Sequence, residues 1–403
     1  MADPDVHSAY RQAGVDYAVL DAGKRDALTE ALATSHWLAA GGARALDGSR
    51  GEPAFVLRFA GSTLAFVLET LGTKSVLARE YHELAGVNRF DHIAYDTVAA
   101  VLNDLICVGA LPLVLNAYFA TGSSAWYAHT ERADALLAGW RRACDDAQCA
   151  WGGGESPSLT DLLAPEEIEL AGSALGFVPP PGEPLLGGDL APGDEIVLLA
   201  SNGLHANGAS LARRIAAGLP QGLLTELPDG SGSGAQTGDT GGASGSDPAG
   251  RAAGAGNLTF GEALLAPSVL YVGLVRRLLG DAQVRLTYLS HITGHGLLKL
   301  MRPQRELTYR IRALPTVPPV LAFLAAHAEL DPAAAHSTLN MGAGFAVYCR
   351  PGGGVRVVEH ARELGLGALL AGAVEEGPRR VILEPVDVTF AGDQLALAPE
   401  RTR

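Results

Sequence analysis

The hydrophobic and polar positions of the first half of the chain predict a mixture of strands and helices. Alternating apolar residues predict strands over 54–59 and 63–68. Apolar residues at helical spacing predict helices over 96–108 and 131–148. A helix starting at Asp96 would use that carboxylate as its N-cap, because an acid there accepts hydrogen bonds from free backbone N–H groups.

The second half repeats this mixture. Strands are predicted over 195–200, 345–348 and 381–383, and helices over 209–217 and 267–279. Because strands and helices alternate in both halves, two α/β layers packed together are expected.

Two segments interrupt the pattern. Residues 178–195 contain three consecutive prolines and a Gly-Gly pair, which is typical of a stiff connector, so domains over 1–177 and 178–403 are expected. Residues 228–256 are rich in glycine and serine and have almost no large apolar side chains. We interpret them as a flexible surface insertion, because they cannot offset the entropy of ordering.

Composition narrows the functional classes. The 403 residues carry a net charge of −14, which argues against nucleic-acid binding but does not exclude a small anionic substrate in a locally positive pocket.

The most apolar stretch, 98–120, is interrupted by Asn103, Asp104, Pro112 and Asn116, so no membrane span is predicted. The acidic N-terminus does not resemble a signal peptide, and four cysteines without metal-binding spacing are interpreted as reduced, buried thiols of a cytoplasmic protein.

The helix predicted from Asp96 carries unusual polar residues. Asn103 lies seven residues after Asp96 and therefore on nearly the same face, with Asp104 one step further around. Carboxylate and amide oxygens are the hard ligands that Mg²⁺ uses beside nucleotide phosphates. The alternative is a cap and two buried polar groups with hydrogen-bond partners.

Two glycine-containing loops carry charged residues. In Glu69-Thr70-Leu71-Gly72-Thr73-Lys74 the lysine could meet a phosphate, although the spacing is not that of a P-loop. In Gly152-Gly153-Gly154-Glu155 the carboxylate could face a metal or an amine. Each could equally be an ordinary turn.

Two histidine-containing turns follow predicted strands. Residues 201–208 (SNGLHANG) combine a serine, two amides and His205, which could donate to an oxyanion or move a proton near pH 7. Residues 291–296 (HITGHG) precede an apolar run, and such a turn at a helix start is suited to anions. A structural role for each histidine is the alternative.

Taken together and in this order, these motifs resemble the phosphoribosylformylglycinamidine cyclo-ligase (aminoimidazole ribonucleotide, or AIR, synthetase) family. The resemblance covers nearly the whole chain except the insertion. The matching segments are 10–16 (YRQAGVD), 72–74 (GTK), 96–104 (DTVAAVLND) with Gly109, Ala110 and Pro112, 118–122 (YFATG), 153–155 (GGE), 203–208 (GLHANG), 264–267 (LLAP), 291–294 (HITG) and 340–344 (NMGAG).

The resemblance implies a two-domain α+β fold. An N-terminal domain with a ferredoxin-like sheet would pair with a second copy to form a homodimer barrel, and a C-terminal α/β domain would pack beside it. ATP and Mg²⁺ would bind between the domains. ATP would activate the amide oxygen of formylglycinamidine ribonucleotide so that a neighbouring nitrogen closes the imidazole ring in purine biosynthesis.

The resemblance also implies roles for individual residues. The expected catalytic residues are His205, Asn207 and Lys74. The expected ATP-binding residues are Gly72, Thr73, Lys74, Asn103, Asp104, Gly153, Gly154 and Glu155. The expected substrate-phosphate residues are Ser201, Asn207, His291, Thr293, Gly294, His295 and Gly296. The expected metal ligands are Glu69, Asp96 and Asp104.

Several positions depart from the family pattern. Glu69-Thr70 stands where Asp-Gly is usual, His295 interrupts a Gly-Gly-Gly turn, and Ser337 stands where arginine is common. Residues 156–158 (SPS) replace a threonine-led stretch, and only 51–55 (GEPAF) remain of a glycine-rich segment that normally covers ATP. Two alternatives therefore stay open: a paralogue that activates another amide, carboxylate or phosphate, and a catalytically silent nucleotide-binding dimer.

Overall fold

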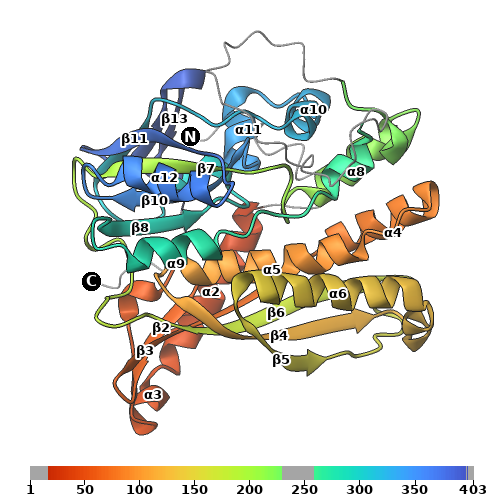
Figure 1. Ribbon diagram of the computed structural model, residues 1–403, viewed down its shortest axis with the longest axis horizontal. Coiled ribbons are helices and arrows are strands. Elements are labelled where there is room, and N and C mark those ends of the chain that lie inside the picture. The colour runs from red at the N-terminus through yellow and green to blue at the C-terminus, as the bar shows by residue number, and fades with distance from the viewer. Residues whose placement is uncertain (1–16, 229–257, 396, 398–403) are drawn as a thin grey trace.

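The computed structural model describes residues 17–228, 258–395 and 397, and within them the chain forms two β-sheets with helices between and around them (Figure 1). This confirms the expected mixed α+β fold. The N-terminal signature 10–16 and the insertion 228–256, apart from Pro228, lie outside the described residues.

The first sheet has six strands in the order β1-β2-β3-β6-β4-β5 and is antiparallel except where β4 pairs with β5. Its strands are β1 Ala43–Ala45, β2 Phe55–Phe59, β3 Ser62–Thr70, β4 Leu111–Thr121, β5 Ala150–Glu155 and β6 Ile168–Phe177. The helices of this half are α2 Tyr17–Ala33, α3 His36–Ala40, α4 Lys74–Ala85, α5 Phe90–Ile106 and α6 Thr130–Ala147, with short 3₁₀ turns η1 Asp47–Ser49 and η2 Ser124–Ala128.

The second sheet has seven strands in the order β13-β12-β9-β11-β7-β10-β8, and only β9 and β12 run parallel. Its strands are β7 Glu195–Ala200, β8 Leu286–His291, β9 Leu307–Ile311, β10 Ala343–Cys349, β11 Ala368–Glu376, β12 Arg380–Leu383 and β13 Val388–Ala391. The helices are α7 Ala209–Gly218, α8 Phe260–Leu264, α9 Val272–Gly280, α10 Pro319–His327, α11 Pro332–Thr338 and α12 Gly354–Glu363, with η3 Gly222–Leu224, η5 Gly296–Met301, η6 Glu384–Val386 and η7 Gly392–Gln394.

Helix α5 is the central element of the molecule. It lies with α6 across one face of the first sheet and also contacts α9 and β8 of the second half (Figure 1). Thirteen of its 17 residues are buried, as expected for a helix enclosed on all sides. Its polar residues therefore need partners inside the protein.

Strand β3 continues beyond the end of its neighbour β2. Pairing with β2 ends at Phe66, opposite Phe55, whereas pairing with β6 continues to Thr70. The last residues of β3 consequently have a free edge on one side. This free edge positions Glu69 beside the candidate site.

Two predicted helix boundaries are wrong. Helix α5 begins at Phe90, where the Asn88 side chain accepts a hydrogen bond from the Phe90 N–H, so Asp96 lies mid-helix and is not a cap. Residues 267–271 are not helical, because side chains from elsewhere bind their backbone, as described below. The strands predicted over 54–59, 63–68 and 195–200 are present, with boundaries shifted by up to two residues.

All four cysteines are free and buried, which agrees with the expected thiols. None of the helices in the described residues has the length and apolar character needed to span a bilayer.

Candidate functional site

A cavity of about 610 Å³ lies between the two halves, at the free edge of β3. Its walls combine residues from β3, α5 and α2 with residues from β8, η5 and the loop after β7. The polar side chains that line it are Lys24, Ser49, Arg50, Glu52, Glu69, Thr70, Asp104, Asn207, His291, Thr293, His295, Lys299 and Arg302. The cavity is therefore lined by charges of both signs.

Two carboxylates from the first half form its acidic side. Glu69 hydrogen-bonds Asp104, and His291 Nδ1 donates to Asp104 Oδ1 over 2.6 Å. Burial, together with the neighbouring Asp104, raises the pKa of Glu69 to about 8. Burial alone would raise the pKa of Asp104, but the hydrogen bond and the charge of His291 lower this pKa to about 2. At neutral pH one carboxyl is protonated and the other is an anion, so the pair shares a proton.

Basic side chains from η5 and the residues after it also line the cavity. Lys299 is buried and its Nζ donates to Thr293 Oγ1. Arg302 Nε donates to the Gly51 carbonyl over 2.7 Å and lies 3.7 Å from Glu52 Oε2. Burial raises the pKa of Glu52, whose carboxylate accepts a hydrogen bond from Tyr288.

In the turn over 291–296, His291, Thr293, Gly294 and His295 line the cavity, whereas Ile292 packs in the hydrophobic core and Gly296 lies outside the lining. His295 adopts a left-handed conformation (φ 71°), and its Nε2 donates to Asp21 of α2 over 2.9 Å. Gly296 is required where the turn meets α11, since a Cβ there would lie 2.2 Å from the His336 carbonyl oxygen. The histidine at position 295, where the family pattern has glycine, therefore links the 291–296 turn to helix α2.

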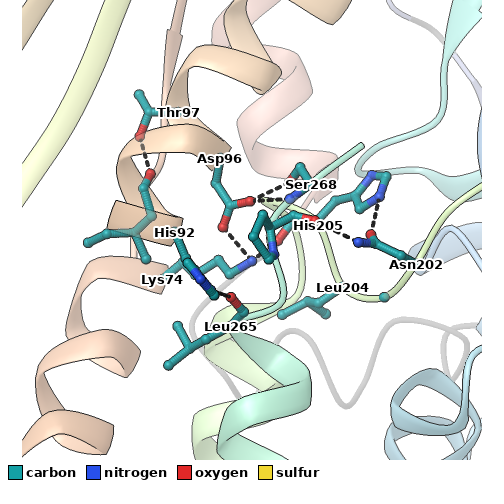
Figure 2. A network of polar contacts seen from close by, with 12 residues as sticks. Lys74, His92, Asp96, Thr97, Asn202, Leu204, His205, Leu265 and Ser268 are labelled. Atoms are coloured by element: carbon teal, nitrogen blue, oxygen red, sulfur yellow. Dashed lines mark hydrogen bonds and ion pairs between the residues drawn. The ribbon is translucent and has the colours of Figure 1, made fainter. Parts of the chain in front are cut away.

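Asp96 and Lys74 form a separate buried network (Figure 2). Neither residue lines the cavity. Lys74 Nζ lies 2.6 Å from Asp96 Oδ2, and both side chains are fully buried. Asp96 Oδ1 also accepts from the N–H and hydroxyl of Ser268, both over 2.6 Å. Lys74 donates to the His205 carbonyl over 2.7 Å. The structure therefore does not bring Asp96 together with Glu69 and Asp104, and Lys74 is engaged with protein groups.

Asn103 is also bound to the segment before α9. Its amide donates to the Val269 carbonyl and its oxygen accepts from the Tyr271 N–H, each over 2.9 Å. Together with the contact between Asp96 and Ser268, these bonds hold residues 268–271 outside any regular helix or strand. Of the three polar residues singled out on this helix, only Asp104 reaches the cavity.

The loop over 201–208 is held by the motif at 340–344. Ser201 donates to Asn340 Oδ1 over 2.7 Å, and the Asn340 amide donates to the Gly203 carbonyl. His205 is buried beside Asn202 and does not line the cavity, whereas Asn207 does. Burial lowers the pKa of His205 to about 3, so the ring is neutral at pH 7 and the structure does not support the expected proton transfer.

The remaining predicted residues lie outside the cavity lining. Gly153, Gly154 and Glu155 are exposed on β5, the edge strand of the first sheet. The Gly72 N–H donates to Glu169, and Thr73 contacts Ser210 of α7 over 2.8 Å. Ser337 is buried in α11 and donates to a carbonyl of its own helix.

Sequence reasoning missed five charged residues of the cavity. Lys299 and Arg302 follow the 291–296 turn closely and could have been found by extending that motif. Glu52 lies in the 51–55 segment that the family resemblance associates with ATP, but its charge was not singled out. Nothing in the sequence pattern marked Lys24 and Arg50, because α2 and the 49–53 turn reach the site only through the tertiary fold. These five residues are Lys24, Arg50, Glu52, Lys299 and Arg302.

No group of three or more His, Cys, Asp and Glu side chains in residues 17–228 and 258–395 is arranged to hold a metal ion. The adjacent oxygens of Glu69 and Asp104 nevertheless fit Mg²⁺ carried by a nucleotide. Such an ion is usually held by one or two protein carboxylates, with phosphates and water supplying the other ligands.

Comparison of the fold finds similar solved structures at low sequence identity. The hydrogenase maturation protein HypE aligns with 84% of this chain and 92% of its own at a TM-score of 0.54 and 15% identity. AaThiL, solved with AMPPCP and TMP, aligns with 84% of this chain and 89% of its own at a TM-score of 0.51 and 15% identity. These likenesses establish the fold alone.

Comparison of the sequence identifies the family. Residues 51–178 match the family described as AIR synthase related protein, N-terminal domain. A Sorangium cellulosum protein named phosphoribosylformylglycinamidine cyclo-ligase is 31% identical over 376 residues, covering 91% of this chain and 94% of that protein. A Methanococcus maripaludis protein of the same name is 28% identical, covering 91% and 92%. The chain belongs to the phosphoribosylformylglycinamidine cyclo-ligase family.

Proposed function

We propose that this protein is an ATP-dependent cyclo-ligase that converts formylglycinamidine ribonucleotide into aminoimidazole ribonucleotide. The observation that carries the proposal is similarity at 31% identity, over 91% of this chain and 94% of the relative, to a protein named for this activity. A cavity between the two halves that is lined by both carboxylates and basic side chains is consistent with it. The alternatives of another substrate or a silent dimer are not favoured by any comparison.

The reaction requires a poor leaving group to be made a good one. The amide oxygen of the substrate takes the γ-phosphoryl group of ATP, and ADP leaves. The neighbouring nitrogen then attacks the activated carbon, the C–O bond breaks, phosphate departs with the oxygen, and the nitrogen loses a proton. The protein must align two anionic ligands and neutralise the charge that builds up during transfer.

Glu69 and Asp104 are proposed to hold Mg²⁺, which would supply charge neutralisation at the triphosphate. Asp104 is prepared for this role because His291 keeps it ionised. Glu69 would release its shared proton when a cation approaches, since the positive charge favours the carboxylate form. Asp96 is assigned a structural role instead, because Lys74 and Ser268 occupy its oxygens.

The turn over 291–296 and Asn207 are proposed to bind the substrate phosphate. Thr293, Gly294 and His295 line the cavity, and His291 stands between this turn and the acidic side. Turn N–H groups and a neighbouring imidazole favour a phosphate without requiring a net positive protein. The chain's overall charge of −14 is compatible with such a local site.

A homodimer formed through the first sheet is part of this proposal. The sheet face turned away from α5 and α6 carries Phe66, Tyr118, Leu175 and Phe177, none of which is fully buried. Apolar side chains in a row across three strands are typical of an interface. The same face ends at exposed β5, so Gly153, Gly154 and Glu155 would meet the second copy rather than the cavity of their own chain.

Two further expectations remain proposals. The first domain is assigned to 1–177 and the second to 178–403, which agrees with a first sheet ending at Phe177 and a second beginning at Glu195. A cytoplasmic location is proposed on the strength of the relatives' names, the buried free thiols and the absence of a membrane-spanning helix among the described residues.

The deciding experiment is a direct assay. Purified protein is incubated with MgATP and formylglycinamidine ribonucleotide, and ADP and aminoimidazole product are followed together. We expect one ADP per imidazole formed and no ADP without substrate. Tight MgATP binding with no product would refute the cyclo-ligase assignment and favour another substrate.

A further inference from the structure

Lysine is rare in this chain, and its positions are informative. Of the 30 basic residues only three are lysines, Lys24, Lys74 and Lys299, and the other 27 are arginines. Lys24 and Lys299 line the cavity, and Lys74 is buried in the neighbouring Asp96 network. An ammonium is a compact point charge, unlike the planar guanidinium. Two of the three lysines therefore line the cavity where phosphate chemistry is proposed.

Lys299 is the buried lysine that faces the cavity. Its side chain is almost entirely enclosed, and its hydrogen bond within the described structure goes to the Thr293 hydroxyl. An ammonium has three N–H donors, so this contact leaves two available. Its charge interacts with those of Asp104 and Glu69, yet no ion pair within 4.0 Å joins it to either in the described residues.

The other basic side chains on the cavity wall have a protein partner or are exposed, and among them Arg50 donates to the Ser35 hydroxyl. Arg302 donates to the Gly51 carbonyl, His291 donates to Asp104, and His295 donates to Asp21. Lys24 is on the exposed helix α2. A buried ammonium that has spare donors and no close carboxylate partner in the described residues is costly for stability unless a ligand uses it.

We infer that Lys299 binds the phosphoryl group that is transferred from ATP, with the Glu69–Asp104 pair on the other side of that group. The inference rests on the proposed function and assigns to Lys299 the contact that the sequence motif alone would give to Lys74. Placed there, the ammonium neutralises phosphoryl oxygens during transfer and moves no proton. Lys74 supports the site only by holding Asp96 and the His205 carbonyl.

The test compares Lys299→Met, which keeps length and removes charge, with Lys299→Arg and with a distant control. Arg312→Met makes the same charge change at an exposed position paired with Glu375 on the second sheet. MgATP affinity is measured by calorimetry, turnover by the coupled assay, and folding by thermal unfolding. We expect Lys299→Met to remain folded, to bind MgATP about tenfold more weakly and to lose about 100-fold or more in kcat.

Lys299→Arg should recover most of the MgATP affinity, and Arg312→Met should match the wild type. If Lys299→Met kept wild-type MgATP affinity and turnover, the inference would be overturned. It would also be overturned if Lys299→Met and Lys299→Arg lost the same affinity and turnover, because the side-chain volume rather than the charge would then matter. If the wild type binds MgATP but makes no imidazole, the proposed function fails while the affinity comparison still decides the role of Lys299.

Chemical labelling gives an independent measurement. A short pulse of acetic anhydride followed by mass spectrometry can report on all three lysines in one experiment, because there are no others. MgATP is expected to protect Lys299 from acetylation, and ADP is expected to protect it less. Equal labelling of Lys299 with and without MgATP would contradict the assignment.

Discussion

His291 Nδ1 and Asp104 Oδ1 lie 2.6 Å apart, although the two residues are 187 positions apart in the chain. The bond joins the end of α5 to the end of β8 and fixes the acidic side of the cavity to the turn that follows β8. It therefore sets the spacing between the proposed metal ligands and the proposed phosphate turn.

Asp104→Asn tests this relationship. The amide can still accept from His291 but cannot supply an anionic oxygen, so Mg²⁺-dependent ATP binding should fall by about 100-fold, the equivalent of roughly 3 kcal/mol. Stability should fall less, by about 1–2 kcal/mol, because the hydrogen bond loses its charge. Calorimetric titrations with and without Mg²⁺ measure the first effect and urea unfolding the second. Unfolding of the variant with unchanged nucleotide affinity would make Asp104 structural.

Asp96→Asn should instead reduce the stability of the protein more than it reduces Mg²⁺-dependent ATP binding. Removing the charge leaves the Lys74 ammonium buried without its partner, which costs about 3–5 kcal/mol. Chemical denaturation measures the loss. The double variant Asp96→Asn with Lys74→Met should recover part of it, since no unpaired charge remains. If Asp96→Asn instead lost Mg²⁺-dependent ATP binding and kept wild-type stability, Asp96 would be a metal ligand.

Because His205 is buried, we predict that the stability of the protein depends on pH. Its pKa is about 3 in the folded protein because of burial, against about 6.5 when unfolded. The unfolded chain therefore binds the proton first as the pH falls, so stability should be full above pH 6.5 and decline from there toward pH 3. Urea midpoints from pH 8 to pH 4 should fall less steeply in His205→Gln than in the wild type. The matched variant at exposed His327 should keep the wild-type slope.

Asp21→Asn should loosen the N-terminal helix. Asp21 is the α2 residue that pairs with His295, and none of the described α2 side chains is fully buried. Losing about 1 kcal/mol from this contact should speed amide exchange in 17–33 about fivefold without changing the two sheets. Glu30→Gln, an exposed charge change on the same helix, serves as the comparison. Identical exchange in both variants would show that the pair does not hold α2.

Tyr118→Arg should disrupt the proposed homodimer. Tyr118 is exposed on the free face of the first sheet, and an arginine there would bring two like charges together across a two-fold axis. Light scattering should show a monomer at concentrations where the wild type is dimeric. Leu137→Arg, an equally drastic change on exposed α6, should leave the dimer intact. A monomeric wild type would refute this interface.

The sequence predicted the fold class and most strands, because these depend on local pattern and short motifs. It misplaced Asp96, since spacing on a helix shows which residues share a face but not what packs against that face. Here α9 and its preceding loop cover the face up to Asn103, and the cavity opens only at Asp104. Lys24 and Arg50 reach the site through tertiary packing that no local pattern encodes.

The position of α5 has a consequence for how the protein folds. Its buried polar groups find their partners in residues 268–271 and in His291, all contributed by the later half of the chain. A fragment ending near residue 177 would leave Asn103 and Asp104 without these partners, so the first half should be a poor autonomous folding unit. The two sheets are expected to melt together rather than one after the other.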